Sequence, residues 1–345
     1  STMKTIVRFL TIATLPLLLL WAEGARASRA QGHLGFLGLA KETVWGTAVA
    51  ATDYVEMMSE NLSTGIDRFP TRNIFSGFYE PDDYAGARRT TGSVVHAGHP
   101  LSLGFFLKAA FTTISQTSIL SGFLYNLNFT GTKSEFADGV PRTPHTLEVN
   151  RNISSGSHQY QGALLNRLTL ALAPNQDLRV TAEWLAKTRA MIPATAPSFP
   201  GSSTDPFTFD TASVQIAGVA NTRLEAFQMV VDNQLEGILA LNNSTEIARI
   251  RAQGPQMIRI SGTLDFADNA EELDFINQTE RAMIVTLTRA QSFALRIEAP
   301  RFVYTTFPVG MPGRGRLMVG FDGMARYLTS SLAAVRVMLT TTRSN

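Results

Sequence analysis

The segment that most constrains the fold is residues 88–111, in which a strand pattern runs directly into a short helix pattern. The strand part alternates polar and β-branched residues around Gly92, as a half-buried strand does. The helix part is too apolar to have a solvated face, so the predicted helix plugs into another part of the fold. The apolar residues of this plug helix are Leu101, Leu103, Phe105, Phe106, Leu107 and Phe111.

A similar strand and short helix recur at a spacing of about 170 residues. The matches lay residues 57–66 on 229–238, residues 89–94 on 259–264, and residues 161–171 on 331–341. Because the three matches follow the same order, they indicate an internal duplication. Two β-rich halves of similar composition can also produce such matches, and that alternative stays open.

Strand patterns fill most of the remaining chain. Residues 160–172 and 177–187 alternate apolar and polar side chains and are joined by a short turn, which predicts a hairpin. The sequence therefore predicts a mostly β fold with two tandem β-sandwich or β-barrel domains, each holding a short packed α-helix. The expected division is a signal-like segment or extension (1–27), an N-terminal arm (28–50), a first domain (51–192), a linker (193–206) and a second domain (207–345).

The N-terminus has the pattern of a secretory signal peptide. Basic residues precede an apolar run over residues 9–22, and the small-residue pattern Ala25-Arg26-Ala27 follows it. The run is short for a membrane span. An uncleaved extension or a misassigned start explains the same residues equally well, so a secreted or periplasmic location remains an alternative.

The composition argues against several classes of function. The chain has no cysteine and a net charge of only +2, which disfavours thiol chemistry, zinc binding and sequence-specific recognition of nucleic acid. Neither a nucleophile elbow nor a phosphate-binding P-loop is present. We therefore expect no enzymatic activity, no catalytic residue, no metal and no cofactor.

Three weaker patterns resemble parts of binding or catalytic sites, but each fits a structural role better. The histidines at 96 and 99 follow the aspartates at 82 and 83, but their loose spacing is more typical of a turn. Residues 310–316 are glycine-rich and basic but are not followed by the helix that cradles a phosphate. The acidic run over residues 265–274 lacks the ligand spacing of a calcium loop, and a solvated helix start at Asp268 explains it better.

Residues 41–47, 57–66, 89–111 and 160–162 together resemble the tail tube proteins of long-tailed (siphovirus-like) bacteriophages, of the tandem-domain type. The resemblance implies β-sandwich or β-barrel domains whose sheets pair with those of neighbours, in rings stacked into a hollow tube. Because six domains surround the channel in that family, two domains per chain imply homotrimeric rings with pseudo-sixfold symmetry. The signal-like N-terminus departs from the family pattern.

The same resemblance implies where the protein works and with what. The expected partners are copies of the chain itself and other tail proteins, namely the tape measure, tail terminator and distal tail proteins. Double-stranded DNA is expected to pass without sequence readout during DNA ejection. The expected location is the virion tail, assembled in the host cytoplasm, with no stable membrane association.

Within this resemblance, two sets of residues are candidates for functional surfaces. The polar alternates of the hairpin over 160–187 are expected to face the channel, although an ordinary sandwich with one solvated face has the same pattern. These residues are Asn166, Thr169, Arg179, Thr181 and Glu183. The long loop over 59–86 is expected to contact the next ring through Phe69, Ile74, Phe75, Phe78 and Tyr79, a self-packed loop being the alternative.

A different class of protein also fits part of the sequence. The signal-like start and the many alternating strands are compatible with a secreted or outer-membrane β-sandwich or β-barrel that has a binding or adhesion role. The small number of tyrosine and tryptophan residues and the proline-rich linker disfavour an outer-membrane barrel.

Overall fold

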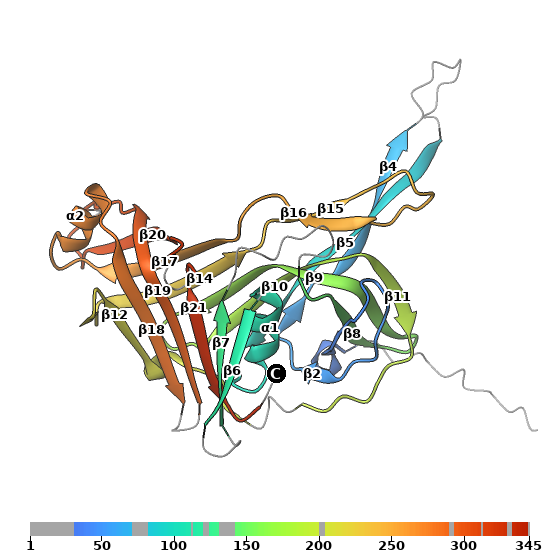
Figure 1. Cartoon of the computed structure of the whole chain (residues 1–345), viewed down its shortest axis with the longest axis horizontal. Helices are drawn as coiled ribbons and strands as arrows, with labels where there is room; N and C mark the ends of the chain where they lie inside the picture. Colours follow the sequence, from blue (N-terminus) through green and yellow to red (C-terminus); the bar gives the residue numbers. More distant parts are fainter. Residues whose placement is uncertain are drawn as a thin grey trace, which may run out of the picture.

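A computed structural model describes residues 31–70, 82–111, 113–119, 124–130, 142–199, 204–289, 293–311, 313–329 and 333–343. The described chain is mostly antiparallel β-structure with two α-helices, which confirms the predicted fold class. Residues 31–199, here called the first half, and residues 204–343, the second half, occupy opposite ends of an elongated molecule (Figure 1). Neither of these helices is long and apolar enough to cross a membrane.

The described residues of the first half form eleven strands and one α-helix. The elements are β1 (Phe36–Lys41), β2 (Asp53–Val55), β3 (Ser59–Glu60), β4 (Ser63–Pro70), β5 (Asp83–Ala97), α1 (Leu103–Ala110), β6 (Thr113–Ile119), β7 (Leu124–Thr130), β8 (His145–Ile153), β9 (Gly156–Leu172), β10 (Arg179–Ala186) and β11 (Thr188–Ile192).

In the second half the described residues form ten strands and one α-helix. The elements are β12 (Ala212–Ile216), β13 (Val219–Ala220), β14 (Leu224–Asp232), β15 (Leu235–Ile238), β16 (Arg249–Ala252), β17 (Met257–Asp265), α2 (Ala270–Ile276), β18 (Arg281–Arg289), β19 (Phe293–Thr306), β20 (Met318–Ala325) and β21 (Arg336–Thr341).

The strands of the two halves pair in the same order. In the first half the order is β1–β8–β9–β10–β5, with β3 and β4 on the far edge of β5. In the second half it is β12–β18–β19–β20–β17–β14. In the first half β11 also pairs with the first part of β9, and in the second half β21 pairs with the first part of β19. The halves are joined because β14 also pairs with β9.

Two of the register irregularities also fall at matching places. The first lies between β8 and β9 and between β18 and β19, where one residue of the first strand opposes two of the second. The pairs that flank it are His145–Ala163 and Leu147–Tyr160 in the first half, and Arg281–Phe302 and Met283–Ala299 in the second. The second irregularity is flanked by Glu183–Arg167 and Trp184–Leu165, and by Asp322–Thr306 and Gly323–Tyr304.

Helix α1 is packed into the first half, as the apolar pattern predicts. Leu103, Phe106 and Leu107 are completely buried, and α1 lies against β9. Phe105 is only partly buried, and the guanidinium of Arg343 lies over its ring at 4.6 Å. Helix α2 begins close to the predicted start at Asp268 and leaves Leu273 and Ile276 exposed. It is therefore packed less deeply than α1.

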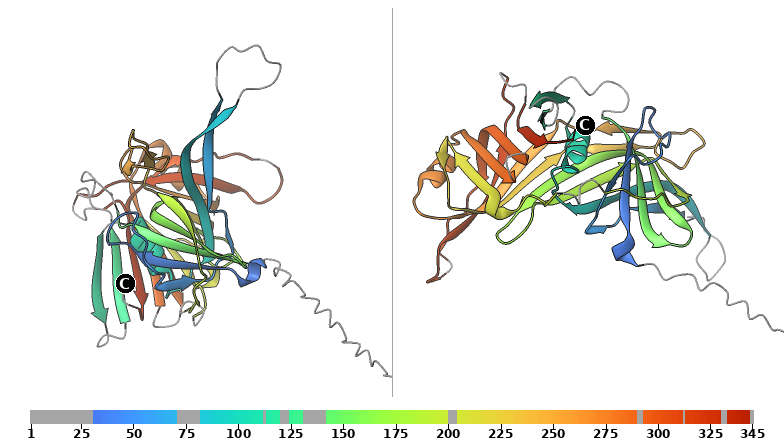
Figure 2. Two further views of the ribbon diagram at one scale, coloured as in Figure 1. Left: turned by 90° about the vertical axis from the view of Figure 1, so that its right-hand side faces the viewer. Right: turned by 90° about the horizontal axis from the view of Figure 1, so that it is seen from below.

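Two segments differ from their predicted roles. Strand β1 lies inside the range 28–50 that the sequence assigns to an arm, but its residues Phe36, Leu37, Leu39 and Ala40 are buried and it pairs with β8. These residues are apolar on both faces, so they belong to the core. Much of the predicted loop 59–86 is instead a long β4–β5 hairpin that projects from the body (Figures 1 and 2).

The β6–β7 hairpin distinguishes the two halves. In the first half it follows α1, and β7 pairs with β21 of the second half. In the second half only four residues, 277–280, separate α2 from β18, so a matching hairpin has no room there. The halves thus share a framework, and the β6–β7 hairpin, which the first half alone provides, adds a second joint to the pairing of β9 with β14.

Candidate assembly surfaces

One face of the sheet that crosses both halves is polar. Directly opposed residues of antiparallel neighbours point to the same side of a sheet. Thr181 opposes Thr169, and Glu183 opposes Arg167, whereas the alternate residues of β10 are buried. The structure therefore brings four of the five predicted channel residues, Thr169, Arg179, Thr181 and Glu183, onto one face.

The fifth predicted residue, Asn166, lies at the register irregularity of β9. Its side chain accepts a hydrogen bond from the N–H of Leu235 at 2.7 Å, and its carbonyl accepts one from Asn233 at 2.8 Å. Asn166 and Glu183 line the same open hollow of about 540 Å³. Asn166 therefore anchors the junction of the two halves at the edge of the polar face.

Charge on the polar face is balanced locally. The guanidinium of Arg167 donates to Asp232 at 2.9 Å and lies 3.6 Å from Glu183. These carboxylates come from the two strands that flank β9, one in each half. The hydrogen bond that Arg167 donates to Asp232 is the main cause of the raised pKa of Arg167. The charge of Arg167 is thus compensated by carboxylates of the two neighbouring strands.

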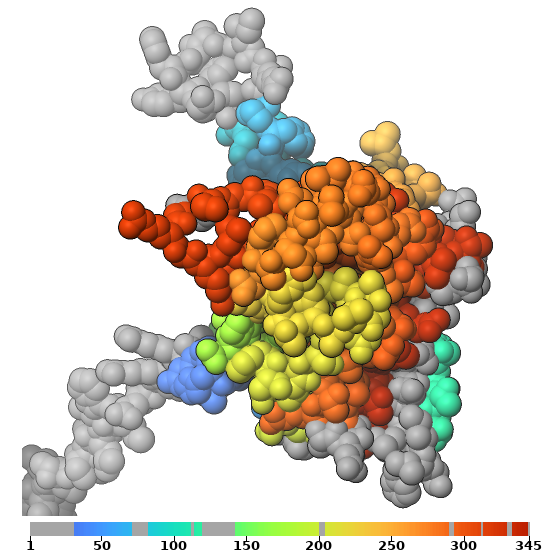
Figure 3. Space-filling view, turned by 90° about the vertical axis from the view of Figure 1, so that its left-hand side faces the viewer, coloured from blue at the N-terminus to red at the C-terminus, as the bar shows by residue number. Residues whose placement is uncertain are grey.

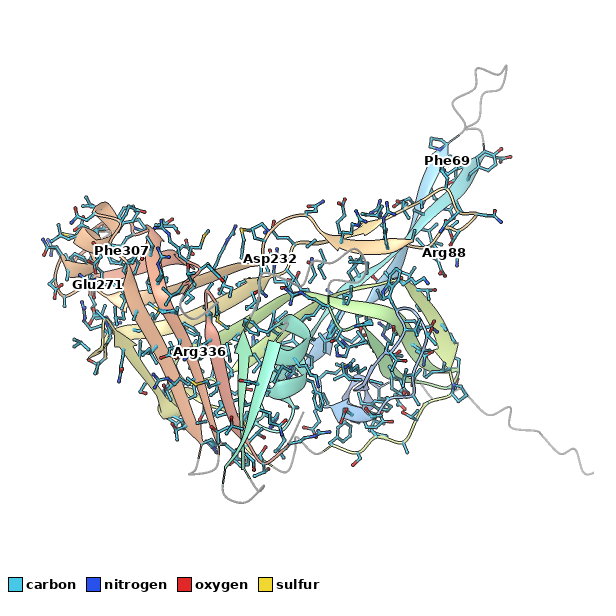
Figure 4. The ribbon with its side chains drawn as sticks, in the orientation of Figure 1. Phe69, Arg88, Asp232, Glu271, Phe307 and Arg336 are labelled. Carbon is cyan, nitrogen blue, oxygen red and sulfur yellow. The ribbon has the colours of Figure 1, made fainter. Side chains whose placement is uncertain are left out.

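The β4–β5 hairpin forms an arm with apolar side chains near its tip. Ion pairs join its strands, with Arg68 bound to Asp83 at 2.9 Å and Arg89 to Asp67 at 3.1 Å. The rings of Phe69 and Tyr84 lie 5.8 Å apart across the hairpin, and each is more than half exposed. Phe69 lies farther out than Arg88 (Figure 4). The other predicted stacking residues, Ile74, Phe75, Phe78 and Tyr79, lie outside the described residues.

A second hairpin rests against the base of this arm. The N–H of Arg88 donates to the carbonyl of Thr245 at 2.7 Å, and the Thr188 hydroxyl donates to Glu246 at 2.6 Å. Thr245 and Glu246 lie between β15 and β16, so a loop of the second half supports the arm of the first (Figure 1). The sequence did not predict this contact, because no local pattern links segments so far apart.

The loop between β19 and β20 is a further surface that the sequence pattern did not predict as an assembly surface. Val309 is 39% exposed and Met311 is 84% exposed, and the orange-red projection in Figure 3 includes this loop. At its far end Arg316 forms ion pairs with Glu225 and, at 3.6 Å, with Asp265. Arg316 of this glycine-rich basic segment is therefore paired with the protein's own carboxylates.

The structure separates the residues considered for metal or acid–base chemistry. His96 is buried against the ring of Phe106, and burial lowers its pKa to about 4. Nδ1 of His99 lies 2.7 Å from the Thr204 carbonyl, while Asp83 is on the arm with Arg68. Within the described residues no three potential metal ligands of the His, Asp or Glu type form a group.

The acidic run is likewise used for ion pairing. Asp274 binds Arg281 at 2.8 Å, and Glu271 pairs with Arg223. The Asp268 carboxylate accepts the N–H of Ala270 at 2.9 Å, as expected at a helix start. These contacts are those of a structural helix end.

Comparison with known proteins gives one match. A protein family described as phage tail tube protein has a model that matches residues 32–325. No curated protein matches the chain.

Proposed function

Because the chain belongs to the phage tail tube protein family, and is thus a structural protein of the virion tail, we propose that it is the major tail tube subunit. Three copies form a ring of six similar domains, and the rings stack into a hollow tube. The observation that carries the proposal is the sheet that continues from β5 of the first half to β20 of the second. A head-to-tail junction of similar units closes into a ring when its rotation allows.

The ring of six rests on an internal duplication, which the shared pairing order and the two matching register irregularities support. The residue matches differ from those expected from sequence. Thr91 and not Arg89 takes the place of Arg259, and the counterpart of β9 is β19 and not residues 331–341. The repeated unit is therefore supported by topology more strongly than by sequence.

The polar sheet face is the proposed channel wall for double-stranded DNA. Its threonines offer no strong attraction to phosphate, and Arg167 is already compensated by Asp232 and Glu183. A strongly basic wall would hold the DNA through the release of its counterions. A balanced wall allows DNA to slide through during ejection.

The exposed arm is the proposed contact between stacked rings. Exposed aromatic side chains such as Phe69 and Tyr84 are typical anchors of protein interfaces. The ends of the tube would meet other tail proteins, namely the tape measure, tail terminator and distal tail proteins. Assembly in the host cytoplasm follows from this role, and a cleaved signal at residues 1–27 would argue for the secreted alternative.

Negative-stain microscopy and sedimentation of the purified full chain test the proposal. The expected result is hollow rings that stack into tubes at high concentration. A protein that stays monomeric at the same concentration, with mass spectrometry showing cleavage after Ala27, would contradict it.

A further inference from the structure

A row of directly paired residues crosses each half at the same place. In the first half the row is Leu164–Leu185–Thr91–Ser63. In the second half it is Val303–Met324–Arg259–Val230. Both rows lie next to the second register irregularity, which fixes the correspondence. Ser63 on β4 therefore holds the position that Val230 holds on β14.

The second row continues where the first one stops. Val230 pairs on its other side with Thr169 of β9, across the junction of the halves. In the described part of the chain β4 pairs only with β5, so Ser63 has no such neighbour. The free side of β4 is thus the counterpart of the side by which β14 joins the first half.

The matching partner strand is also present and also free. Arg167 and Thr306 occupy equivalent places at the irregularity, so Thr169 corresponds to Pro308 two residues later. By the same count the buried Leu170 and Leu172 correspond to Val309 and Met311, which are exposed. The first pair is buried where β14 joins β9, and the second has no strand beside it in the described chain.

Pro308 suits this position because no backbone N–H is needed there toward the partner strand. The N–H of Asn233 donates to Asn166, so odd-numbered residues of β14 direct their backbone groups toward β9. The Val230–Thr169 pair is therefore a position without hydrogen bonds across the junction. Pro308 has no N–H, so at the corresponding position it forgoes no hydrogen bond to the partner strand. The missing donor instead explains why β19 and β20 stop pairing at Thr306–Asp322.

We propose, building on the ring described above, that residues 306–311 of one copy add to the free edge of β4 in a second copy, with Pro308 opposite Ser63. Phe307 and the arm lie at opposite ends of the molecule, so one chain does not make this joint with itself (Figure 4). The partner is a second copy because the two free edges correspond to two strands that already pair within the chain. The edge of β4 corresponds to that of β14, and residues 306–311 correspond to the end of β9.

The free chain protects this edge with side chains. Leu62 corresponds to Met229, whose backbone groups face β9. The Leu62 carbonyl accepts hydrogen bonds from Arg151 at 2.7 Å and Tyr160 at 2.8 Å, and its N–H donates to Glu60 at 3.0 Å. Such caps keep an unpaired edge from indiscriminate pairing. Arg151 and Glu60 release Leu62 when the second copy arrives.

A cysteine pair tests the joint, because the chain has no cysteine of its own. Antiparallel partners without hydrogen bonds have Cα atoms about 4.5 Å apart, within the range of a disulfide. A chain with Ser63→Cys and Pro308→Cys should form rings when reduced and, on oxidation, run as covalent dimers and trimers of the 37.6 kDa chain on a denaturing gel. Mixing the two single variants should give only the linked dimer.

The matched control combines Ser63→Cys with Arg314→Cys, which lies in the same exposed loop and should not link. Rings that form without a 63–308 link overturn this joint but leave the ring intact. Absence of both rings and links overturns the joint and the proposed function together. Unaltered protein gives a second readout, since the amides of residues 62–66, of Phe307 and of residues 309–311 should exchange more slowly after ring formation; unchanged exchange in rings contradicts the joint.

Discussion

The N–H of Asn233 donates to the carbonyl of Asn166 at 2.8 Å, and this bond sets the register in which the two halves of the chain join. The Asn233 side chain is completely buried at the junction. Its Nδ2 donates to the Leu165 carbonyl at 2.8 Å, and its Oδ1 accepts from Gln256 at 2.8 Å. The buried side-chain amide of Asn233 is thus hydrogen-bonded through both its nitrogen and its oxygen at the junction of the two halves.

Asn233→Ala should lower the free energy of unfolding by about 2 kcal/mol, because it leaves buried polar partners unsatisfied. Urea denaturation of the full chain measures the change. Asn242→Ala, at an exposed position, is the control and should change it by less than about 0.5 kcal/mol. Equal stability of the two variants would show that Asn233 does not hold the junction.

Acid should destabilise the fold below neutral pH through two histidines. Burial lowers the pKa of His96 and of His145 to about 4 from an ordinary 6.5. Between these values the unfolded chain binds protons that the folded chain does not, so stability falls as pH falls. Each histidine contributes a slope of about 1.4 kcal/mol per pH unit within this window.

Thermal unfolding measured between pH 7 and pH 4.5 checks this dependence. His96→Leu should make the slope shallower by the contribution of one proton, although packing changes also shift the absolute stability. Asn242→Ala, a non-titrating change at an exposed position, should leave the slope unchanged. A slope that is the same in all three proteins would rule out His96 as its cause.

If the arm contacts the next ring, altering its tip should block the stacking of rings without blocking their formation. Replacing Phe69 and Tyr84 by serine removes the exposed aromatic side chains near the tip but leaves the arm's ion pairs in place. Rings should form normally and tubes should shorten or disappear in electron micrographs. Val219→Ser, which alters an exposed apolar side chain on β13, serves as control. Tubes of normal length in the arm variant would refute its role in stacking.

The balanced channel face predicts a gain of DNA binding when one carboxylate is reversed. Glu183→Lys adds a cation beside Arg167 in every chain of the ring. Tubes of this variant should retain short double-stranded DNA at low salt and release it as salt rises, since the attraction is to phosphate. Fluorescence anisotropy measures the retention, and Asp210→Lys, exposed in the second half, is the control. Equal retention by both variants would place Glu183 away from the channel.

The sequence predicts the features that lie within a single strand, hairpin or helix. The alternation over β9 and β10 correctly predicts which side chains are polar and share a face, and the apolar residues of α1 predict its burial. Strand β1 lies in the range 28–50, which the sequence pattern assigns to an N-terminal arm. The pattern misses this strand because a strand buried on both faces has no alternation to detect.

The joints between distant segments could not be predicted in this way. The sequence match placed Arg89 on Arg259, two residues from the paired row that places Thr91 there. A shift of two residues keeps every side chain on its own face, so alternation cannot reveal it. The pairing of β9 with β14 and the exposure of Val309 and Met311 depend on long-range contacts, and no single segment encodes them.

The symmetry of the assembled ring tests the central claim most directly. Cryo-electron microscopy of tubes formed by the full chain should show rings of three chains, with the two halves at alternating, nearly equivalent positions around one channel. The β5–β10–β9–β14–β17–β20 face should line that channel. Rings of six chains, a channel lined by another face, or particles without a channel would contradict the account.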